Sequence, residues 1–229
     1  QKTVEELKED FTHNITHELK TPIAVAYAAN DALLNFPTDT PEKRKDYHLI
    51  VQEQLKQLGG LVEQILSMSM EQRKNFRLNY ETVELQPMLE NIIIQQRLKA
   101  DKPVSIHLQI EGNITIRADR THLSNMISNL SNNAVKYSDE KAEICIKCQI
   151  HGKTCQISVI DKGIGIPLDK QPYLFNKFYR VPTGNRHDVK GYGLGLYYVK
   201  TMAELHGGSI HVESSPGKGS TFTLEIPLK

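Results

Sequence analysis

Residues 119–138 read DRTHLSNMISNLSNNAVKYS, and they combine a helical pattern with more asparagine than a helix normally holds. Asp119 suits the N-terminal cap of a helix over 119–137, because its short carboxylate can accept from the first free backbone N–H groups. Asparagine is a mediocre helix former. This helix would nevertheless contain four of them, Asn125, Asn129, Asn132 and Asn133. Such a composition requires a reason other than helix stability.

Asn129 and Asn133 are four residues apart and therefore share one face of the helix. Their carboxamide oxygens could bind a hard cation such as Mg²⁺, which keeps several waters and takes the phosphates of a substrate as ligands. Lys136 lies one turn beyond Asn132, close enough to reach a phosphate. The alternative interpretation is an exposed helix face that is merely polar.

Two glycine-rich segments follow. Residues 161–167 (DKGIGIP) come directly after an expected strand, and residues 191–196 (GYGLGL) open an expected helix. Glycines at a helix N-terminus expose backbone N–H groups to a phosphate, and the helix dipole favours the negative charge. The second segment is not a dinucleotide-binding fingerprint, since no strand leads into it. Each segment alone is a weak signal.

The pattern around these segments predicts a mixed unit of helices and strands. After a polar linker over 71–80, we expect helices over 85–100, 119–137 and 194–206. We expect strands over 104–110, 114–117, 143–150, 154–160, 209–213 and 220–226. The result is an α+β sandwich over 81–229, with a sheet covered on one face by helices.

Residues 1–70 predict two long amphipathic helices, because apolar residues recur at three- and four-residue steps on both sides of a break at 35–41. One such hairpin buries an apolar stripe on each helix poorly. Pairing of two hairpins into a four-helix bundle is the natural remedy. We therefore expect a homodimer that forms through residues 1–70.

His17 lies in the run FTHNITHELKTP, residues 11–22. A histidine is partly neutral and nucleophilic near neutral pH, which suits a phosphoryl acceptor. Glu18 could take the proton from one ring nitrogen and so activate the other. Thr21 could position a water one turn later, and Pro22 can bend the helix. His13 and His17 could instead chelate a metal, but no third ligand is evident.

Bulk composition limits the classes of partner. Charged residues make up 24%, hydrophobic residues 39%, and the net charge is +1 with Lys and Arg spread widely, which argues against nucleic acid. No stretch approaches the roughly 18 apolar residues of a membrane span. The chain starts in mid-helix pattern without an initiator Met, so we expect a fragment of a longer protein.

Zinc could bind Cys145, Cys148, His151 and Cys155, but buried strand cysteines are the better interpretation.

In this order, the segments resemble the ATP-binding domain of the sensor histidine kinases, within the wider family that includes gyrase, Hsp90 and MutL. The resemblance runs from about Thr82 to the C-terminus. Its motifs are the N box (119–138), the G1 box (161–167), the F box FNKFYR (175–180), the G2 box (191–196) and the last glycine motif GKGSTF (217–222). Residues 17–22 look like the H box of these kinases, and residues 1–70 like their dimerisation and phosphotransfer hairpin.

The resemblance implies roles for the nucleotide-site residues. Asp161 should accept a hydrogen bond from the adenine amino group, Tyr137 should lie against the base, and Asn133 should be a ligand of Mg²⁺, with Asn129 nearby. Lys136 and Arg180 should meet the phosphates of ATP. The other implied nucleotide-binding positions are Gly163, Gly165, Gly191, Gly193, Leu194, Gly195 and Thr221. The stretch between Phe178 and Gly191 would form a lid.

The resemblance also implies the reaction. His17 would be the acceptor in ATP- and Mg²⁺-dependent autophosphorylation, Glu18 the base, and Thr21 would assist hydrolysis of the phospho-aspartate of a bound response regulator. The phosphoryl group would pass from His17 to an aspartate of that regulator. The chain would be the cytoplasmic portion of an inner-membrane sensor, attached to the membrane only through other segments.

Two other classes stay open at this point. One is a phosphatase or binding module, in which Thr21 acts, ATP binds and His17 is a poor acceptor. The other is a conformational ATPase of the gyrase and Hsp90 type, in which nucleotide drives dimer clamping.

Overall fold

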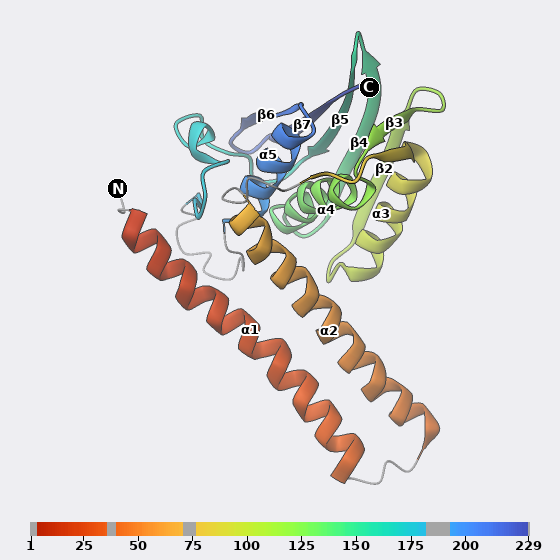
Figure 1. Cartoon of the computed structure of the whole chain (residues 1–229), viewed down its shortest axis with the longest axis vertical. Coiled ribbons are helices and arrows are strands. Elements are labelled where there is room, and N and C mark those ends of the chain that lie inside the picture. Colours follow the sequence, from red (N-terminus) through yellow and green to blue (C-terminus); the bar gives the residue numbers. More distant parts are fainter. Residues whose placement is uncertain (1–3, 36–39, 71–76, 182–192, 229) are drawn as a thin grey trace. The chain divides into compact units, whose positions relative to one another are not determined.

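The computed structural model describes residues 4–35, 40–70, 77–181 and 193–228 (Figure 1). The chain divides into two compact units, Gln1–Lys74 and Asn75–Lys229. The sequence predicted a hairpin that ends at residue 70 and an ATP-binding domain that begins at residue 81, and these exact bounds remain predictions.

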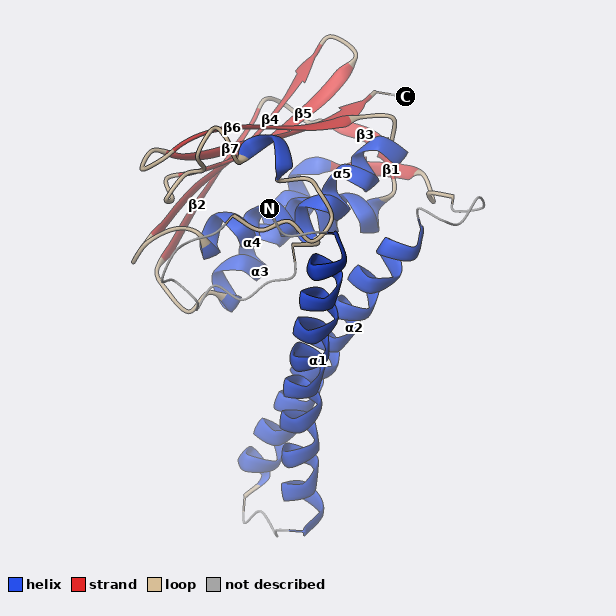
Figure 2. Ribbon diagram, turned by 90° about the vertical axis from the view of Figure 1, so that its left-hand side faces the viewer, coloured by secondary structure: helices blue, strands red, loops and turns tan. Residues whose placement is uncertain are grey.

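The first unit is a helical hairpin of α1 (Val4–Asn35) and α2 (Pro41–Met70), which pack along each other (Figure 2). Pro41 suits the first turn of α2, where its missing N–H costs no hydrogen bond. Thr40 precedes it, and its hydroxyl accepts from the backbone N–H of Lys43 at 3.3 Å. Large apolar side chains remain exposed along both helices: Ile23, Val25, Tyr27, Leu34, Leu49, Ile50, Leu55 and Val62.

The second unit is built on a five-stranded sheet in the order β2-β4-β5-β7-β6. The strands are β2 (Val104–Ile110), β4 (Ala142–His151), β5 (Thr154–Asp161), β6 (Ser209–Ser215) and β7 (Gly219–Pro227). Strands β2 and β4 are parallel, and the other neighbours are antiparallel. A separate antiparallel pair joins β1 (Glu81–Glu84) to β3 (Thr115–Ala118).

Three helices lie on the same side of this sheet: α3 (Leu85–Lys99), α4 (Arg120–Lys136) and α5 (Gly195–Leu205) (Figure 2). Buried and partly exposed residues alternate along β4, β5 and β7, as expected for strands with one face on a core. The largest fully buried side chains come from the sheet and the three helices together, and they include Leu89, Leu130, Ile146, Ile157, Met202 and Leu224. The predicted α+β sandwich is confirmed.

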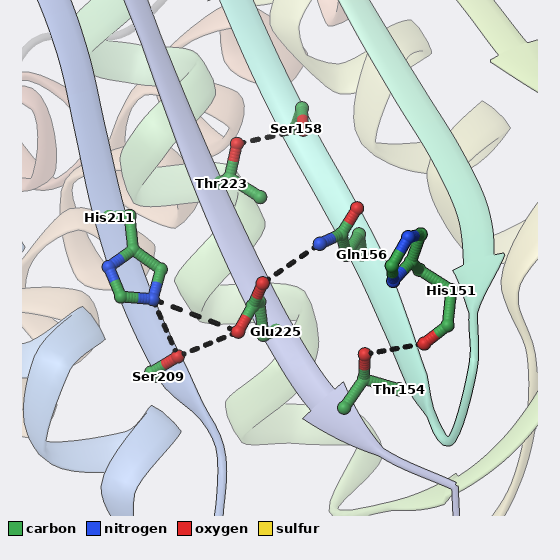
Figure 3. Close-up of polar contacts among 8 residues, drawn as sticks. All are labelled: His151, Thr154, Gln156, Ser158, Ser209, His211, Thr223 and Glu225. Carbon is green, nitrogen blue, oxygen red and sulfur yellow. Dashed lines mark hydrogen bonds and ion pairs between the residues drawn. The ribbon is translucent and has the colours of Figure 1, made fainter.

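The opposite face of the sheet is polar (Figure 3). The Gln156 amide donates to Glu225 Oε1 at 2.8 Å, and Ser209 Oγ donates to Glu225 Oε2 at 3.1 Å. The hydrogen bond from Gln156 is the main cause of a pKa of Glu225 below its usual range. Ser158 and Thr223 bond through their hydroxyls at 2.9 Å. This face therefore satisfies its own polar groups without a second layer of helices.

Asp119 ties the start of α4 to two other segments. Its Oδ1 accepts from the backbone N–H of His122 at 3.1 Å, which confirms it as the N-terminal cap. Its Oδ2 accepts from the backbone N–H of Asn79 at 2.9 Å, and its own N–H donates to Nε2 of the buried His206 at 3.1 Å. The chain therefore joins the second unit at the N-terminal end of α4.

Most predicted elements are confirmed with small shifts at their ends, but β1 and the short 3₁₀ helix η1 (Gln171–Tyr173) were not predicted. Strand β1 has only four residues and buries one of them, Val83, so it carries too little alternation to be recognised.

We expect Leu130→Ala to destabilise the second unit by about 2–5 kcal/mol, because Leu130 is fully buried on α4 and alanine would leave a cavity. Urea unfolding followed by circular dichroism measures the change. Leu98→Ala is the matched control, since Leu98 on α3 is 75% exposed, and it should stay within about 0.5 kcal/mol of the unmodified chain. Equal losses in both variants would contradict the assignment of this core.

Candidate functional site

A cavity in the second unit lies where α4 and β5 end and α5 begins. Five segments line it: the end of α4, the end of β5 with the loop after it, the stretch over 174–181, residues 193–196 at the start of α5, and the start of β7. The lining residues are Asn133, Lys136, Tyr137, Asp161, Ile164, Gly165, Ile166, Leu174, Tyr179, Arg180, Val181, Gly193, Gly195, Leu196, Ser220 and Phe222.

Asp161 is the acidic residue of this cavity, and it is 7% exposed. Its Oδ1 accepts two backbone hydrogen bonds, from Gly163 N at 2.8 Å and Ser220 N at 3.2 Å. Burial raises the pKa of Asp161, and the two hydrogen bonds oppose that rise. Because both described bonds reach Oδ1, Oδ2 is left to accept from a ligand.

Two cationic side chains and a phenol lie at the same cavity. Lys136 Nζ is 5.3 Å from the centre of the Tyr137 ring, within range of a cation–π contact. Burial raises the pKa of Tyr137, and the nearby charge of Arg180 opposes the rise. The phenol therefore stays neutral at physiological pH, while Lys136 and Arg180 supply positive charge suited to an anion.

The asparagines of α4 have different surroundings. Asn133 lines the cavity, whereas Asn132 is exposed. Asn129 Nδ2 donates to the backbone oxygen of Asn125 at 2.9 Å, which leaves its Oδ1 directed elsewhere. A Cβ added at Gly195 would lie 2.8 Å from that Oδ1, so the asparagine face of α4 meets the first residue of α5.

Gly165 sets how closely the loop after β5 approaches the sheet. Its φ is +69°, a conformation that other L residues rarely adopt. A Cβ there would lie 1.9 Å from the carbonyl oxygen of Ser215. The loop backbone is therefore pressed against the end of β6, and no side chain fits between them.

The structure brings together eight of the nucleotide-site residues predicted from the sequence: Asn133, Lys136, Tyr137, Asp161, Gly165, Arg180, Gly193 and Gly195. Asn129, Gly163, Leu194 and Thr221 do not line the cavity. Gly163 instead bonds Asp161, and Leu194 is buried. Gly191 lies outside the described residues, as does most of the lid predicted between Phe178 and Gly191, of which only residues 179–181 are described.

Sequence reasoning missed Ser220 and Phe222, which line the cavity on either side of Thr221. Successive strand residues point to opposite faces, so Thr221 lies on the other face of β7. Asp161 on β5 pairs with Ser220 on β7, and this register, which the sequence alone does not give, places Ser220 beside Asp161. Leu174 and Val181 were also missed, since both lie outside the motifs, whereas Ile164, Ile166 and Leu196 lie within motifs 161–167 and 191–196 but had no predicted role of their own.

His17, Glu18 and Thr21 lie on α1, with Pro22 inside the same helix. The side chains of His13, His17 and Glu18 lie outside the described residues, so the predicted acceptor and base are placed by their backbone alone. Thr21, four residues after His17, has an exposed side chain.

Cys148 and Cys155 are both buried, and their sulfur atoms are 3.7 Å apart on neighbouring strands. This placement makes them core residues. Among the described residues, no group of three or more His, Cys, Asp and Glu side chains could hold a metal ion. In the same described residues, no helix has the length and apolar character needed to cross a bilayer.

Two family models match the two units. Residues 118–229 match the histidine kinase-, DNA gyrase B- and HSP90-like ATPase model, and residues 7–74 match the His Kinase A (phospho-acceptor) domain. Together they define a phospho-acceptor hairpin followed by an ATPase domain. The chain belongs to the sensor histidine kinases of two-component systems.

Curated relatives agree over the full chain. The sensor protein RprX of Bacteroides fragilis is 35% identical over 100% of this chain and 45% of its own length. The sensor-like histidine kinase SenX3 of Mycobacterium tuberculosis is 32% identical over 98% of this chain and 55% of its own length. The chain therefore spans about half the length of the curated relatives that it matches.

Solved structures share the fold. Full-length ShkA, in complex with AMPPNP, matches 99% of this chain and 46% of its own with a TM-score of 0.70 at 24% identity. The histidine kinase ThkA, in complex with the response regulator protein TrrA, matches 96% of this chain and 61% of its own with a TM-score of 0.61 at 23% identity.

We expect Gly165→Ala to cost more stability than Gly112→Ala, although both glycines have a positive φ. The left-handed conformation costs either alanine roughly 1–2 kcal/mol. Gly112, at +76°, has nothing within 4 Å of an added Cβ, whereas Gly165 would meet the Ser215 oxygen. Hydrogen exchange should rise at 161–167 and at 214–220 only in Gly165→Ala. The same exchange in both variants would show that the loop does not depend on this close approach.

Proposed function

We propose that this chain is the catalytic core of a sensor histidine kinase, which binds ATP and Mg²⁺ in the described cavity and phosphorylates itself on His17. One observation carries the proposal: the cavity unites a buried carboxylate, Asp161, with the cations Lys136 and Arg180. A ligand with a hydrogen-bond donor on an apolar body and a cluster of negative charge suits this combination, and ATP is such a ligand.

The base of ATP fits the residues near Asp161. Oδ2 of Asp161 accepts from the adenine amino group, while Oδ1 stays bonded to the Gly163 and Ser220 backbone. Tyr137 lies against the base. Apolar lining residues, Ile164, Leu174 and Phe222 among them, bury the ring and supply the contact area that an aromatic ligand requires.

The phosphates fit the residues around the start of α5. Gly193, Leu194 and Gly195 offer backbone N–H groups at a helix N-terminus, and the helix dipole adds to the attraction. Lys136 and Arg180 add full positive charges. Asn133 supplies a carboxamide oxygen for Mg²⁺, with Asn129 nearby, and oxygen is the ligand that this cation prefers. Gly191 and Thr221 complete the set of proposed nucleotide-binding positions.

The transfer step joins the two units. One imidazole nitrogen of His17 attacks the γ-phosphorus, the bond from that phosphorus to the β–γ bridging oxygen breaks, and ADP leaves. Glu18 takes the proton from the other ring nitrogen. The phosphoryl group then passes to an aspartate of a response regulator. The complex of ThkA with its response regulator TrrA supports this class of partner.

We further propose that two copies pair through residues 1–70 into a four-helix bundle, since the hairpin leaves apolar side chains exposed on both helices. Residues 71–80 would link this hairpin to an ATP-binding domain over 81–229. The sensor names of the curated relatives, and the part of them that this chain spans, support a cytoplasmic portion of an inner-membrane sensor.

Thr21 supports a second activity, hydrolysis of the regulator's phospho-aspartate. Its side chain is exposed one turn after His17 on α1, where it could hold a water beside a bound partner.

We expect γ-labelled ATP with Mg²⁺ to label the unmodified chain and not His17→Ala. The label should be acid-labile and alkali-stable, as a phosphoramidate bond is. His48→Ala is the control, since His48 lies on α2 and has no proposed role. An unlabelled native chain that still binds ATP would sink the kinase proposal and favour the phosphatase or binding module. ATP hydrolysis without a phosphohistidine would favour the conformational ATPase.

We expect Asp161→Asn to reduce ATP affinity by roughly 10- to 100-fold, the value of a hydrogen bond to a charged acceptor. The melting temperature should not fall, because the amide oxygen of Asn can still accept hydrogen bonds from the backbone N–H groups of Gly163 and Ser220. The raised pKa means that the folded state holds the proton more tightly, so stability falls as pH rises through that pKa, and Asn removes this loss. Calorimetry measures the affinity, and a thermal scan measures the melting temperature.

The same carboxyl predicts a pH dependence. As pH falls, ATP affinity should begin to drop above the usual range of an aspartate, because Asp161 takes up its proton early. Asp161→Asn should lack this drop. An affinity that stays constant through that range in the native chain would show that ionised Asp161 does not hold the base.

A further inference from the structure

Gln171, in η1, makes two hydrogen bonds close to the cavity without lining it. Its Nε2 donates to the backbone oxygen of Ile166 at 2.9 Å and to the backbone oxygen of Ser214 at 2.8 Å. Both partners are carbonyl oxygens, so the atom that faces them is the amide nitrogen with its two hydrogens. One side chain thereby joins the loop after β5 to the end of β6.

The Ser214 hydroxyl joins the same segments. It accepts from the backbone N–H of Ile166 at 2.8 Å, donates to the backbone oxygen of Gly219 at 2.8 Å, and lies 2.9 Å from Ser220 Oγ. A hydroxyl has one hydrogen and two lone pairs. Since its hydrogen goes to Gly219, Ser220 is the donor of the last bond. Ser214 is therefore fully satisfied, and each of its bonds ends on a segment that contributes to the cavity.

These bonds set the distance between two walls of the cavity. One wall is the loop over 164–166, and the other is the start of β7 with Ser220 and Phe222. Asp161 connects to the second wall through the N–H of Ser220. Neither Gln171 nor Ser214 lies in the cavity, yet both bond a residue of the first wall, Ile166.

We propose that Gln171 and Ser214 are positioning residues, which hold these two walls at the separation that fits the adenine base. This inference rests on the proposed function. It assigns to both residues an effect on nucleotide affinity and none on the transfer step, because they bond segments beside the proposed position of the base and none of the residues proposed to meet the phosphates. Loss of either side chain should therefore weaken the binding of ATP with Mg²⁺ and the binding of ADP without Mg²⁺ by the same factor.

The test is Gln171→Met in the whole chain, since methionine keeps the length of the side chain and lacks the donor. The KM for ATP in His17 labelling should rise roughly three- to tenfold, the net value of one or two hydrogen bonds. The rate at saturating ATP should not change, and the Kd for ADP without Mg²⁺ should rise by the same factor as the KM.

Gln156→Met is the matched control. Gln156 is also partly buried and also loses a 2.8 Å hydrogen bond, to Glu225 on the polar face of the sheet (Figure 3). It should lose a similar amount of stability and leave the KM for ATP unchanged. A rise in KM equal to that of Gln171→Met would overturn the inference, because loss of stability alone would then explain it.

Ser214 gives an independent measurement that does not depend on how well Gln171→Met folds. Ser214→Ala should raise the KM for ATP, and Ser214→Thr, which keeps the hydroxyl, should restore it. An unchanged KM in Ser214→Ala, or a fall in the saturated rate at unchanged KM, would also overturn the inference. Failure of the native chain to bind ADP would count against the proposed function instead.

Discussion

The second unit depends on the placement of one buried carboxylate at the end of β5. Asp161 is nearly enclosed, and a charge in such a place is costly unless hydrogen bonds satisfy it. Two backbone N–H groups do so, one from the loop after β5 and one from the start of β7. The glycines of both segments permit this close approach, since a Cβ at Gly219 would lie 2.0 Å from the Asp161 carbonyl oxygen. The close approach of these segments therefore depends on a hydrogen-bond acceptor at position 161, which an asparagine would also supply.

Sequence reasoning recovered the architecture because its signals are local. The helix cap at Asp119, the periodicity of α1 and α2, and the alternation along β4 and β5 each act within a few residues. Asp161 and Tyr137 were predicted from the resemblance of residues 161–167 and 119–138 to family motifs, which are also short segments of sequence. Strand β1 escaped because it exists only through its pairing with β3, more than thirty residues away.

The parts of the site that sequence reasoning missed are those fixed by contacts between distant segments. Ser220 and Thr221 are both small and polar, and only the register of β7 against β5 decides which one faces the cavity. Gln171 looks like a surface residue in a loop, and its role appears only when Ser214, 43 positions later, is brought beside it. No property of either residue alone gives the pairing.

The hydrogen bond from the Asn79 backbone N–H to Asp119 fixes one point near the start of the second unit. That point is the first turn of α4, whereas Asn133, Lys136 and Tyr137 are at its last turns. A helix of 17 residues extends about 25 Å, so the length of α4 separates the Asn79 contact from the cavity. Because Asn79 is held at the end of α4 remote from the cavity, a force on the chain at Asn79 would act on the first turn of α4 and not directly on Asn133, Lys136 or Tyr137.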